Sequence, residues 1–444
     1  MIIFLETLGC SRNQVDSEMM HGKLGANGHT MTDAPSQAEV IIINTCGFIS
    51  TASDEAVDVI LEMAEFKRDG SCKKLIVTGC LAQRYKDDKS LVSTLPEVDA
   101  FLGTGACDTI VDVVEGQQDK TVTLFPDPNK REFQDILEPR QLTSHFYAYV
   151  KVSEGCSRKC TYCIIPQLRG QQRSRPGADI CKEASDLISR GVKEIILTAE
   201  NTTDYGQDLN DNTGLEHVLT FLADKLHKNH STAWIRFLYT HPKTLTRKIM
   251  LCVKKSKNIC AYYDVPVQHA SSKVLKRMGR SYTNQDLYTL FKTIRQIVPH
   301  AVLRTTIIVG FPGETQEDFQ ILMKLIEDIK FDHLGVFTYS DSYDLKSHHL
   351  KNHIPEDLAE ERHDMIMAAQ ARISREINTQ YVGKTFEVLV EENPEPGLYI
   401  GRTMFQAPEV DGVTFIYENE LETGAFVNVR ITDGYEYDIA GVLA

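Results

Sequence analysis

The chain has 444 residues, 42% hydrophobic and 25% charged, a composition typical of a globular protein with a large core. Acidic residues outnumber basic ones by 62 to 48, and the net charge of −14 disfavours a function that rests on binding nucleic-acid phosphates. No apolar stretch approaches the roughly 18 residues of a membrane span, and residues 1–6 lack the basic start of a secretory signal. We therefore expect a cytoplasmic protein without a membrane contact, in which eleven cysteines indicate metal or redox chemistry.

The first part of the chain predicts three β units, each an apolar strand that ends just before a cysteine and is followed by a helix. The cysteines are Cys10, Cys46 and Cys80, and the predicted helices cover residues 16–24, 53–66 and 82–95. Ligands of an open parallel sheet collect beyond the carboxyl ends of its strands, so these cysteines should converge. We expect a doubly wound parallel sheet over residues 1–125 and a three-cysteine iron–sulfur site at its edge. Three separately buried cysteines are the alternative.

A polar, proline-containing stretch over residues 126–143 predicts a linker. Beyond it, apolar segments alternating with amphipathic ones predict a partial (β/α)6 barrel over residues 144–378. The predicted strands are residues 147–152, 194–198, 234–239, 261–267, 303–310 and 333–339. The predicted helices include residues 180–190, 284–298 and 316–329, and a long final helix over 355–380.

The densest cysteine group is a C-x3-C-x2-C motif in the loop after the first barrel strand, at the face where such barrels place their chemistry. Its members are Cys156, Cys160 and Cys163. Three close thiolates fit one face of a 4Fe–4S cluster, and the missing fourth cysteine leaves one iron open for a non-protein ligand. A zinc knuckle that lacks one ligand is the less favoured alternative. The remaining cysteines are interpreted as structural or incidental: Cys72, Cys107, Cys181, Cys252 and Cys260.

Short alternating strands between turn residues predict a small antiparallel β-barrel over residues 379–444. From residue 380 onward twelve acids stand against three bases, so −9 of the net charge of −14 lies here. A barrel this acidic should repel phosphates and attract a basic protein, whereas a merely solubilising domain is the alternative.

Together these motifs resemble a known family. The C-x3-C-x2-C motif on a partial barrel is similar to that of the radical S-adenosylmethionine (SAM) enzymes. The upstream cysteines and the small last barrel, called TRAM, resemble the methylthiotransferase branch of that group. Within this branch, RimO-like enzymes modify an aspartate of ribosomal protein S-twelve, and MiaB-like enzymes modify adenosine in transfer RNA. The segments that resemble the RimO form are residues 8–18, 164–170, 173–175, 264–269, 334–340 and 407–412.

The resemblance implies an enzyme that inserts a methylthio group at the β-carbon of the aspartate after a 5′-deoxyadenosyl radical has abstracted hydrogen. It implies SAM and two 4Fe–4S clusters, one held by each cysteine set, with sulfur delivered through the upstream cluster. The implied SAM contacts are Tyr162, Thr198, Glu200, Gln268, Val309 and Gly310, and no catalytic residue is assigned. It further implies a low-potential electron donor of the flavodoxin or ferredoxin type. The basic S-twelve protein would be the partner of the acidic TRAM domain, and direct RNA binding is not expected to dominate.

Three segments depart from the usual RimO pattern: Arg12 in place of lysine, Glu200-Asn201 in place of Gln-Asp, and Asp341-Ser342-Tyr343 in place of a more acidic stretch. Basic residues gather near the second cysteine motif and are expected to offset the SAM carboxylate, to contact the substrate or to form a solvated loop: Arg158, Lys159, Arg169, Arg173 and Arg175. The competing hypotheses are a MiaB-like transfer RNA enzyme and a two-cluster electron carrier without catalysis.

Overall fold

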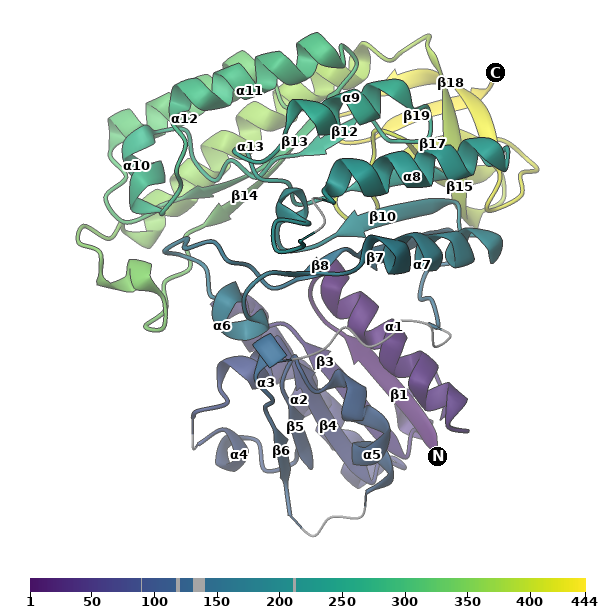
Figure 1. The fold of residues 1–444 in the computed structure, drawn as a ribbon, viewed down its shortest axis with the longest axis vertical. Helices are drawn as coiled ribbons and strands as arrows, with labels where there is room; N and C mark the ends of the chain where they lie inside the picture. The colour runs from purple at the N-terminus through teal and green to yellow at the C-terminus, as the bar shows by residue number, and fades with distance from the viewer. Residues whose placement is uncertain (89, 117–119, 131–139, 211–212) are drawn as a thin grey trace.

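The computed structural model describes residues 1–444 except 89, 117–119, 131–139 and 211–212. An N-terminal α/β domain, a central barrel domain and a C-terminal β-barrel follow one another along the chain (Figure 1). Residues 131–139 of the predicted linker at 126–143 lie outside the described residues, and the domain limits at 125, 143 and 378 stay predictions. No helix within the described ranges combines the length and apolarity that crossing a membrane requires.

The first domain is built on a six-stranded parallel sheet in the order β2-β1-β3-β4-β5-β6. Its strands are β1 (Ile2–Thr7), β2 (Thr30–Met31), β3 (Val40–Thr45), β4 (Lys74–Gly79), β5 (Ala100–Leu102) and β6 (Val122–Leu124). Its helices are α1 (Ser11–Ala26), η1 (Pro35–Gln37), α2 (Ser50–Asp69), α3 (Cys80–Arg84), α4 (Leu91–Thr94), η2 (Cys107–Thr109) and α5 (Ile110–Glu115).

Helices cover both faces of this sheet, because the buried central strand β3 alternates its side chains between two cores. Ile41 and Ile43 pack with α2, and Ile42 packs on the other face with α1 and α5. The predicted doubly wound sheet is therefore confirmed, although the sequence indicated only three of its six strands.

The predicted helix over residues 82–95 is wrong. The structure has the short helices α3 and α4 there, with a turn between them. The Asp88 carboxylate accepts hydrogen bonds from the backbone nitrogen and the hydroxyl of Ser90, at 2.8 and 2.7 Å. An acidic side chain bonded two residues onward stabilises a turn in competition with the helix.

The central domain is a partial barrel made of two three-stranded parallel sheets, β11-β10-β7 and β12-β13-β14. A bridge between Ile235 and Ile259 connects the two sheets. The barrel strands are β7 (Tyr147–Lys151), β10 (Glu194–Thr198), β11 (Trp234–Phe237), β12 (Tyr262–Asp264), β13 (Val302–Val309) and β14 (His333–Thr338). The hairpin strands β8 (Ser153–Glu154) and β9 (Arg173–Ser174) flank the second cysteine motif.

Helices between the barrel strands form its outer layer (Figure 1). The longer ones are α7 (Gly177–Ser189), α8 (Leu215–Lys228), α9 (Arg247–Lys255), α11 (Asn284–Ile297), α12 (Gln316–Ile329) and α13 (Glu356–Thr379). Short helices in the connections of this domain are α6 (Ile165–Arg169), η4 (Thr202–Asp204), α10 (Ser272–Arg277) and η5 (Lys346–His349), and η3 (Pro128–Lys130) precedes the first barrel strand. The six predicted strands are all present, so the predicted partial barrel is confirmed.

The C-terminal domain is a closed five-stranded barrel in the order β15-β16-β17-β19-β18. Its strands are β15 (Thr385–Glu395), β16 (Leu398–Thr403), β17 (Thr414–Tyr417), β18 (Phe426–Gly434) and β19 (Ile439–Leu443). Closure leaves no unpaired sheet edge, and Val388, Val390, Ile416 and Val429 fill its small core.

The small barrel is fastened to the central barrel by buried charges. Arg236 and Glu194, both fully buried, pair at 2.6 Å, and Arg402 of the small barrel lies 2.8 Å from the second oxygen of Glu194. Arg236 also donates to the carbonyl of Met404. A further contact runs from the Tyr262 hydroxyl to Asp411 at 2.6 Å. Arg402 and Asp411 of the small barrel therefore act inside the molecule.

We expect Arg236→Met to destabilise the protein by about 3–5 kcal/mol, because it leaves the buried Glu194 carboxylate with one cation instead of two. The measurement is a urea titration followed by fluorescence of the single tryptophan, Trp234, which lies on the same strand. Arg372→Met, which breaks a solvent-exposed pair with Glu327, is the control and should cost less than about 1 kcal/mol. Equal effects of the two substitutions would contradict the assignment.

Candidate active site

The three upstream cysteines lie at the carboxyl ends of the adjacent strands β1, β3 and β4. Cys10 precedes α1, Cys46 follows β3, and Cys80 is the first residue of α3. The backbone is shaped to bring them together, since Gly9 and Gly79, each before a cysteine, have φ of +98° and +97°. A Cβ on Gly9 would lie 2.8 Å from Cβ of Cys46, so the first two cysteine loops are in contact.

The fully buried Asn13 joins the three upstream cysteine loops, and sequence reasoning missed it. Its amide nitrogen donates to the carbonyls of Leu8 and Thr45, at 2.8 and 3.0 Å. Its amide oxygen lies 4.0 Å from Sγ of Cys80 and accepts a hydrogen bond from Arg169 at 2.5 Å. One side chain thus holds the loops before Cys10 and Cys46 and the thiol of Cys80.

Two arginines set the electrostatics of these thiols. Burial raises the pKa of the Cys80 thiol to about 12; Arg169 opposes this shift, and the neighbouring Cys10 and Cys46 add to it. Burial also acts against ionisation of Cys10, but Arg12 and Arg169 outweigh it and lower the Cys10 pKa. The three thiols are therefore electrostatically coupled, beside two buried cations that favour thiolates.

The downstream cysteines lie in the loop between β8 and α6. The backbone nitrogen of Cys156 donates to Gly170 at 3.0 Å, and that of Cys163 donates to Cys160 at 3.3 Å, which closes the loop. Burial raises the pKa of Cys156 to about 11 and that of Cys163 to about 12, and the neighbouring cysteines add to both shifts. The three thiols of the motif are therefore electrostatically coupled, and their role as cluster ligands stays a prediction.

The beginning of α1 brings the two cysteine sets to one side of the barrel. Hydroxyls of Ser11 and Thr198 are 3.1 Å apart, and Arg12 donates to the carbonyl of Ala199 at 3.2 Å. Val15, one turn onward, belongs to the core that fills the barrel interior. The residues after Cys10 therefore lie directly against the end of β10 (Figure 1).

Glu200, at the end of β10, has the chemistry that a ligand amine requires. Its side chain is 3% exposed, and neither carboxylate oxygen accepts a hydrogen bond from a residue that the structure describes. Arg12 and Arg169 lie 3.4 and 3.7 Å from one oxygen, yet burial prevails and raises the Glu200 pKa. A buried carboxylate with unused acceptors fits a positively charged donor.

The other implied SAM contacts differ in what their side chains can reach. The Tyr162 hydroxyl accepts hydrogen bonds from Arg280 at 2.6 and 3.0 Å, so the ring is held in place. Gln268 takes a left-handed φ of +65° while its backbone pairs with β13, a strained conformation that often marks functional positions. Thr198 is fully buried against Ser11.

Val309 and Gly310 have packing roles. The Val309 side chain is fully buried in the core outside the barrel, so only its backbone is available at the barrel face. A Cβ on Gly310 would lie 2.5 Å from Cβ of Ala359, so α13 requires this glycine. On the face of β13 opposite to the Val309 side chain, the half-buried Ile308 packs beside Tyr162.

The predicted basic group does not act as one solvated loop. Arg169 and Arg175 are buried in ion pairs, Arg169 with Asp16 and Arg175 with Glu183. Arg158 pairs with Asp204 at 2.6 Å. Lys159 is exposed, and Arg173 pairs through its backbone in the hairpin of β8 and β9.

Sequence reasoning missed two further residues beside the downstream cysteines. Arg280 stacks near the rings of Tyr162 and Tyr282, at 5.8 and 5.9 Å. His241 packs edge-on against Tyr282, and its Nδ1 accepts the backbone N–H of Lys243 at 3.2 Å, so the ring is neutral there. No local motif marks either residue, because both reach the site from later parts of the chain: His241 follows β11 and Arg280 follows α10.

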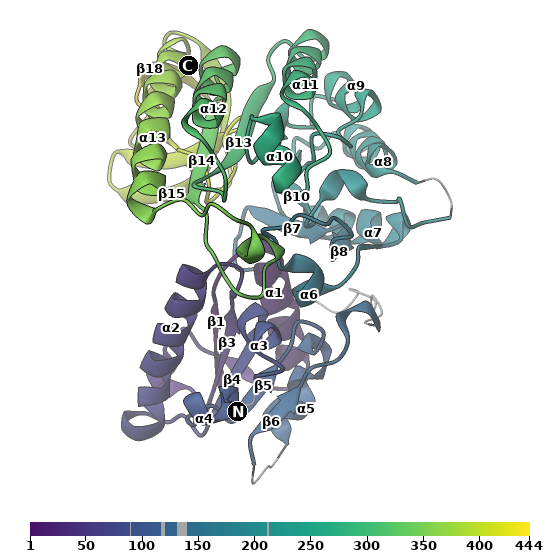
Figure 2. The ribbon, with the colours of Figure 1, turned by 90° about the vertical axis from the view of Figure 1, so that its left-hand side faces the viewer.

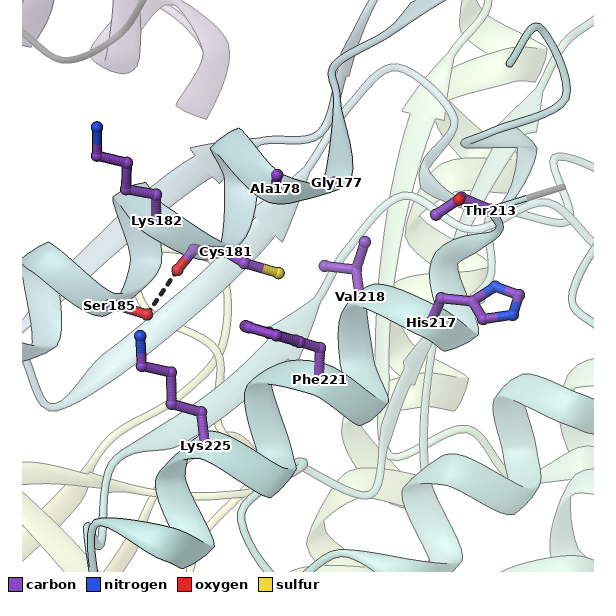
Figure 3. Close-up of a pocket in the computed structure, with 10 residues that line it drawn as sticks. All are labelled: Gly177, Ala178, Cys181, Lys182, Ser185, Thr213, His217, Val218, Phe221 and Lys225. Atoms are coloured by element: carbon purple, nitrogen blue, oxygen red, sulfur yellow. Dashed lines mark hydrogen bonds between the residues drawn. The ribbon is translucent and has the colours of Figure 1, made fainter. Parts of the chain in front are cut away.

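The donor set suits a cluster. Within the described ranges, no three His, Cys, Asp or Glu side chains meet the spacing for a single metal ion, whereas in a four-iron cluster each thiolate binds its own iron. A hollow on the outer side of the barrel, between α7 and α8, is lined by Cys181, Lys182, Phe221 and Lys225 (Figure 3). Neither cysteine set contributes to its lining.

Comparison with known proteins agrees with this architecture. Residues 2–103 match the uncharacterized protein family UPF0004, residues 150–326 match the radical SAM superfamily and residues 382–443 match the TRAM domain. Among solved structures, the radical SAM methyltransferase TsrM from Kitasatospora setae covers 92% of this chain, and the match covers 80% of TsrM, with a TM-score of 0.56. At 12% identity this likeness concerns the fold alone. These matches define the class, which is that of the radical SAM enzymes.

Two relatives are similar over the whole chain. The ribosomal protein uS12 methylthiotransferase RimO of Desulfosudis oleivorans is 46% identical, over 99% of both chains. The RimO protein of Clostridioides difficile is 44% identical, over 99% of this chain and 98% of its own. The chain belongs to the RimO family of radical SAM methylthiotransferases.

Burial and the cations Arg280, Arg158 and Lys243 lower the pKa of His241 to about 2, so folding excludes a proton that the unfolded chain binds near pH 6.5. Stability should therefore fall as pH drops below about 6.5, by up to about 1.4 kcal/mol per pH unit from this group. Thermal unfolding of His241→Asn and wild type between about pH 7 and pH 5 measures this. We expect a flatter profile for the variant, and His300→Asn, at an exposed position, is the control. Parallel profiles for wild type and His241→Asn would contradict the prediction.

Proposed function

We propose that this chain inserts a methylthio group at the β-carbon of an aspartate in ribosomal protein uS12. The observation that carries the proposal is the convergence of two cysteine sets from two domains beside Glu200, in a chain that shares the whole length of RimO proteins. A substrate that belongs to the ribosome supports a cytoplasmic location.

The downstream cysteines would hold a 4Fe–4S cluster that binds SAM. When bound, this pair supplies an electron and a 5′-deoxyadenosyl radical that removes hydrogen from the substrate carbon. Glu200 would accept hydrogen bonds from the SAM amine through its unused oxygens, and Tyr162, fixed by Arg280, would lie against the adenine. Gln268 and the backbones at Thr198, Val309 and Gly310 would line the same face.

The upstream cysteines Cys10, Cys46 and Cys80 would hold a second 4Fe–4S cluster through which sulfur is delivered. Their coupled thiols and the adjacent Arg12 and Arg169 support this assignment, since fixed cations offset the negative charge of a thiolate-bound cluster. Asn13 would keep the three loops in position. A low-potential donor of the flavodoxin or ferredoxin type would supply the electrons.

We propose that the basic uS12 protein binds the acidic surface of the TRAM domain. Fewer acids are available on this surface than the number of acids in the sequence suggests. Glu391 pairs with Arg402, the exposed Glu409 accepts from Tyr147 and Asp411 accepts from Tyr262, so these acids already have partners within the molecule. The exposed acids include Glu387, Glu392, Glu395, Glu420, Glu422, Asp433 and Glu436.

Three tyrosines on the same barrel are about half exposed: Tyr417, Tyr435 and Tyr437. The Tyr435 pKa is raised, first by the desolvation of its hydroxyl and then by the charge of Asp433 and by the nearby Tyr417. Acids and aromatic rings are therefore close together on this barrel. Carboxylates beside aromatic faces suit lysine and arginine side chains, and this supports a basic protein partner over RNA.

Mass spectrometry of anaerobic reactions tests the substrate. Reconstituted enzyme, SAM and reductant are incubated with uS12 or with transfer RNA. We expect a hydrogen replaced by SCH3 on one aspartate of uS12, and no change on RNA. Methylthiolated RNA together with unmodified uS12 would overturn the proposal.

Iron analysis tests the second cluster. Cys46→Ala should lose about half of the bound iron, because one of two four-iron clusters needs that thiolate. Cys72→Ala is the matched control, since Cys72 is buried in the core of the same domain and donates to the Lys74 carbonyl. If Cys46→Ala retains the wild-type iron content, the upstream cysteines do not hold a cluster.

A further inference from the structure

The segment after β14, residues 340–350, touches both cysteine loops, and we call it the bridging loop. It leaves the last barrel strand and reaches toward the N-terminal domain, beside α6 (Figure 2). It contains Asp341-Ser342-Tyr343.

On the upstream side, Arg84 binds the loop through its guanidinium group. Arg84 is the last residue of α3, four residues after Cys80. The guanidinium makes two parallel bonds to the Asp344 carboxylate, both 2.8 Å, and a third to the Ser342 hydroxyl at 2.9 Å. Its remaining nitrogen donates to the carbonyl of Gly47, next to Cys46, at 2.8 Å. Only 4% of the Arg84 side chain is exposed.

In the middle of the loop, Leu345 lies in a small apolar cluster with Cys80, Ile164 and Leu168. Ile164 directly follows Cys163, so this cluster joins one cysteine of the upstream set to the neighbour of one in the downstream set. Leu345 is 6% exposed, and its packing keeps water away from this contact.

On the downstream side, the loop is bonded to the second cysteine motif. The backbone nitrogen of Ser347 donates to the carbonyl of Thr161, between Cys160 and Cys163, at 3.0 Å. The Ser347 hydroxyl accepts from Tyr339 at 2.8 Å, which ties the loop back to the end of β14. The bridging loop is therefore anchored at both cysteine sets.

We propose that Arg84 is a positioning residue, which, through Asp344 and Gly47, sets the spacing between the two cysteine sets. This inference rests on the proposed function, because the spacing matters when a radical formed at one set must meet sulfur delivered from the other. A small misplacement of reacting groups costs far more in rate than in stability.

Arginine is required for this role by geometry. Its planar fork makes two bonds to one carboxylate while a third nitrogen reaches Gly47, whereas the single ammonium of lysine offers no such fixed pattern. Arg84→Lys therefore keeps the charge and loses the positioning.

Hydrogen–deuterium exchange on the full-length protein without added cofactors gives the first test. We expect Arg84→Gln and Asp344→Asn to raise exchange in residues 341–350 and around Gly47, with Arg84→Lys between them and wild type. The control is Lys67→Gln, which breaks a 2.7 Å pair with Asp99 within the N-terminal domain. The two substitutions remove the same contact from opposite sides, one in each domain. Unchanged exchange in both variants would overturn the inference.

The second test measures how SAM cleavage is coupled to product. The enzymes are reconstituted Arg84→Gln and Asp344→Asn variants that retain the wild-type iron content. In them, the ratio of 5′-deoxyadenosine formed to uS12 methylthiolated should rise by about tenfold, while the KM for SAM stays unchanged. Arg84→Asp combined with Asp344→Arg should recover part of the coupling. An unchanged ratio, or iron loss in every variant, would overturn the positioning role. A wild-type enzyme that leaves uS12 unmodified would instead refute the proposed function, and the exchange test would still stand.

Discussion

The hydrogen bond from Arg169 to Asn13 is the contact on which the geometry of the site depends. Asn13 holds the upstream cysteine loops, and Arg169 ends α6 of the barrel domain, so this bond fixes one domain's cysteines to the helix that follows the other domain's cysteine motif. Around it lies a buried cluster in which Lys151 bonds Asp16 and Glu154, and Arg169 bonds both of the same acids. A buried charge without its partner is costly, so the arrangement holds as a unit.

Much of the architecture follows from local sequence patterns. The parallel sheet, the partial barrel and the closed last barrel could be predicted because strand and helix periodicities are local properties. The approach of the upstream cysteines to one another could be predicted because each follows a strand, and parallel strands bring their ends together. The downstream cysteines could be predicted as a group from their spacing within one loop. The break between α3 and α4 could not, since it depends on the side-chain bond from Ser90 to Asp88.

The residues that sequence reasoning missed reach the site from distant segments. Arg84 and Asp344 are 260 positions apart, and their pairing exists only once both domains have folded. Asn13 lies close to Cys10 in the chain, but its importance comes from the carbonyl of Thr45 and from Arg169. Val309 shows the converse, because the family resemblance implied a SAM contact there, and strand alternation buries its side chain in the outer core and leaves its backbone for such a contact.

The seam between the small barrel and the central barrel has a consequence for modularity. Arg402 and Asp411 supply charged partners to Glu194 and Arg304, inside the domain that carries the chemistry. An exchange of this barrel for a more basic one that binds RNA would leave those buried charges uncompensated. The acid content of the C-terminal domain is therefore divided between two duties, and only the exposed share is free to change with the partner.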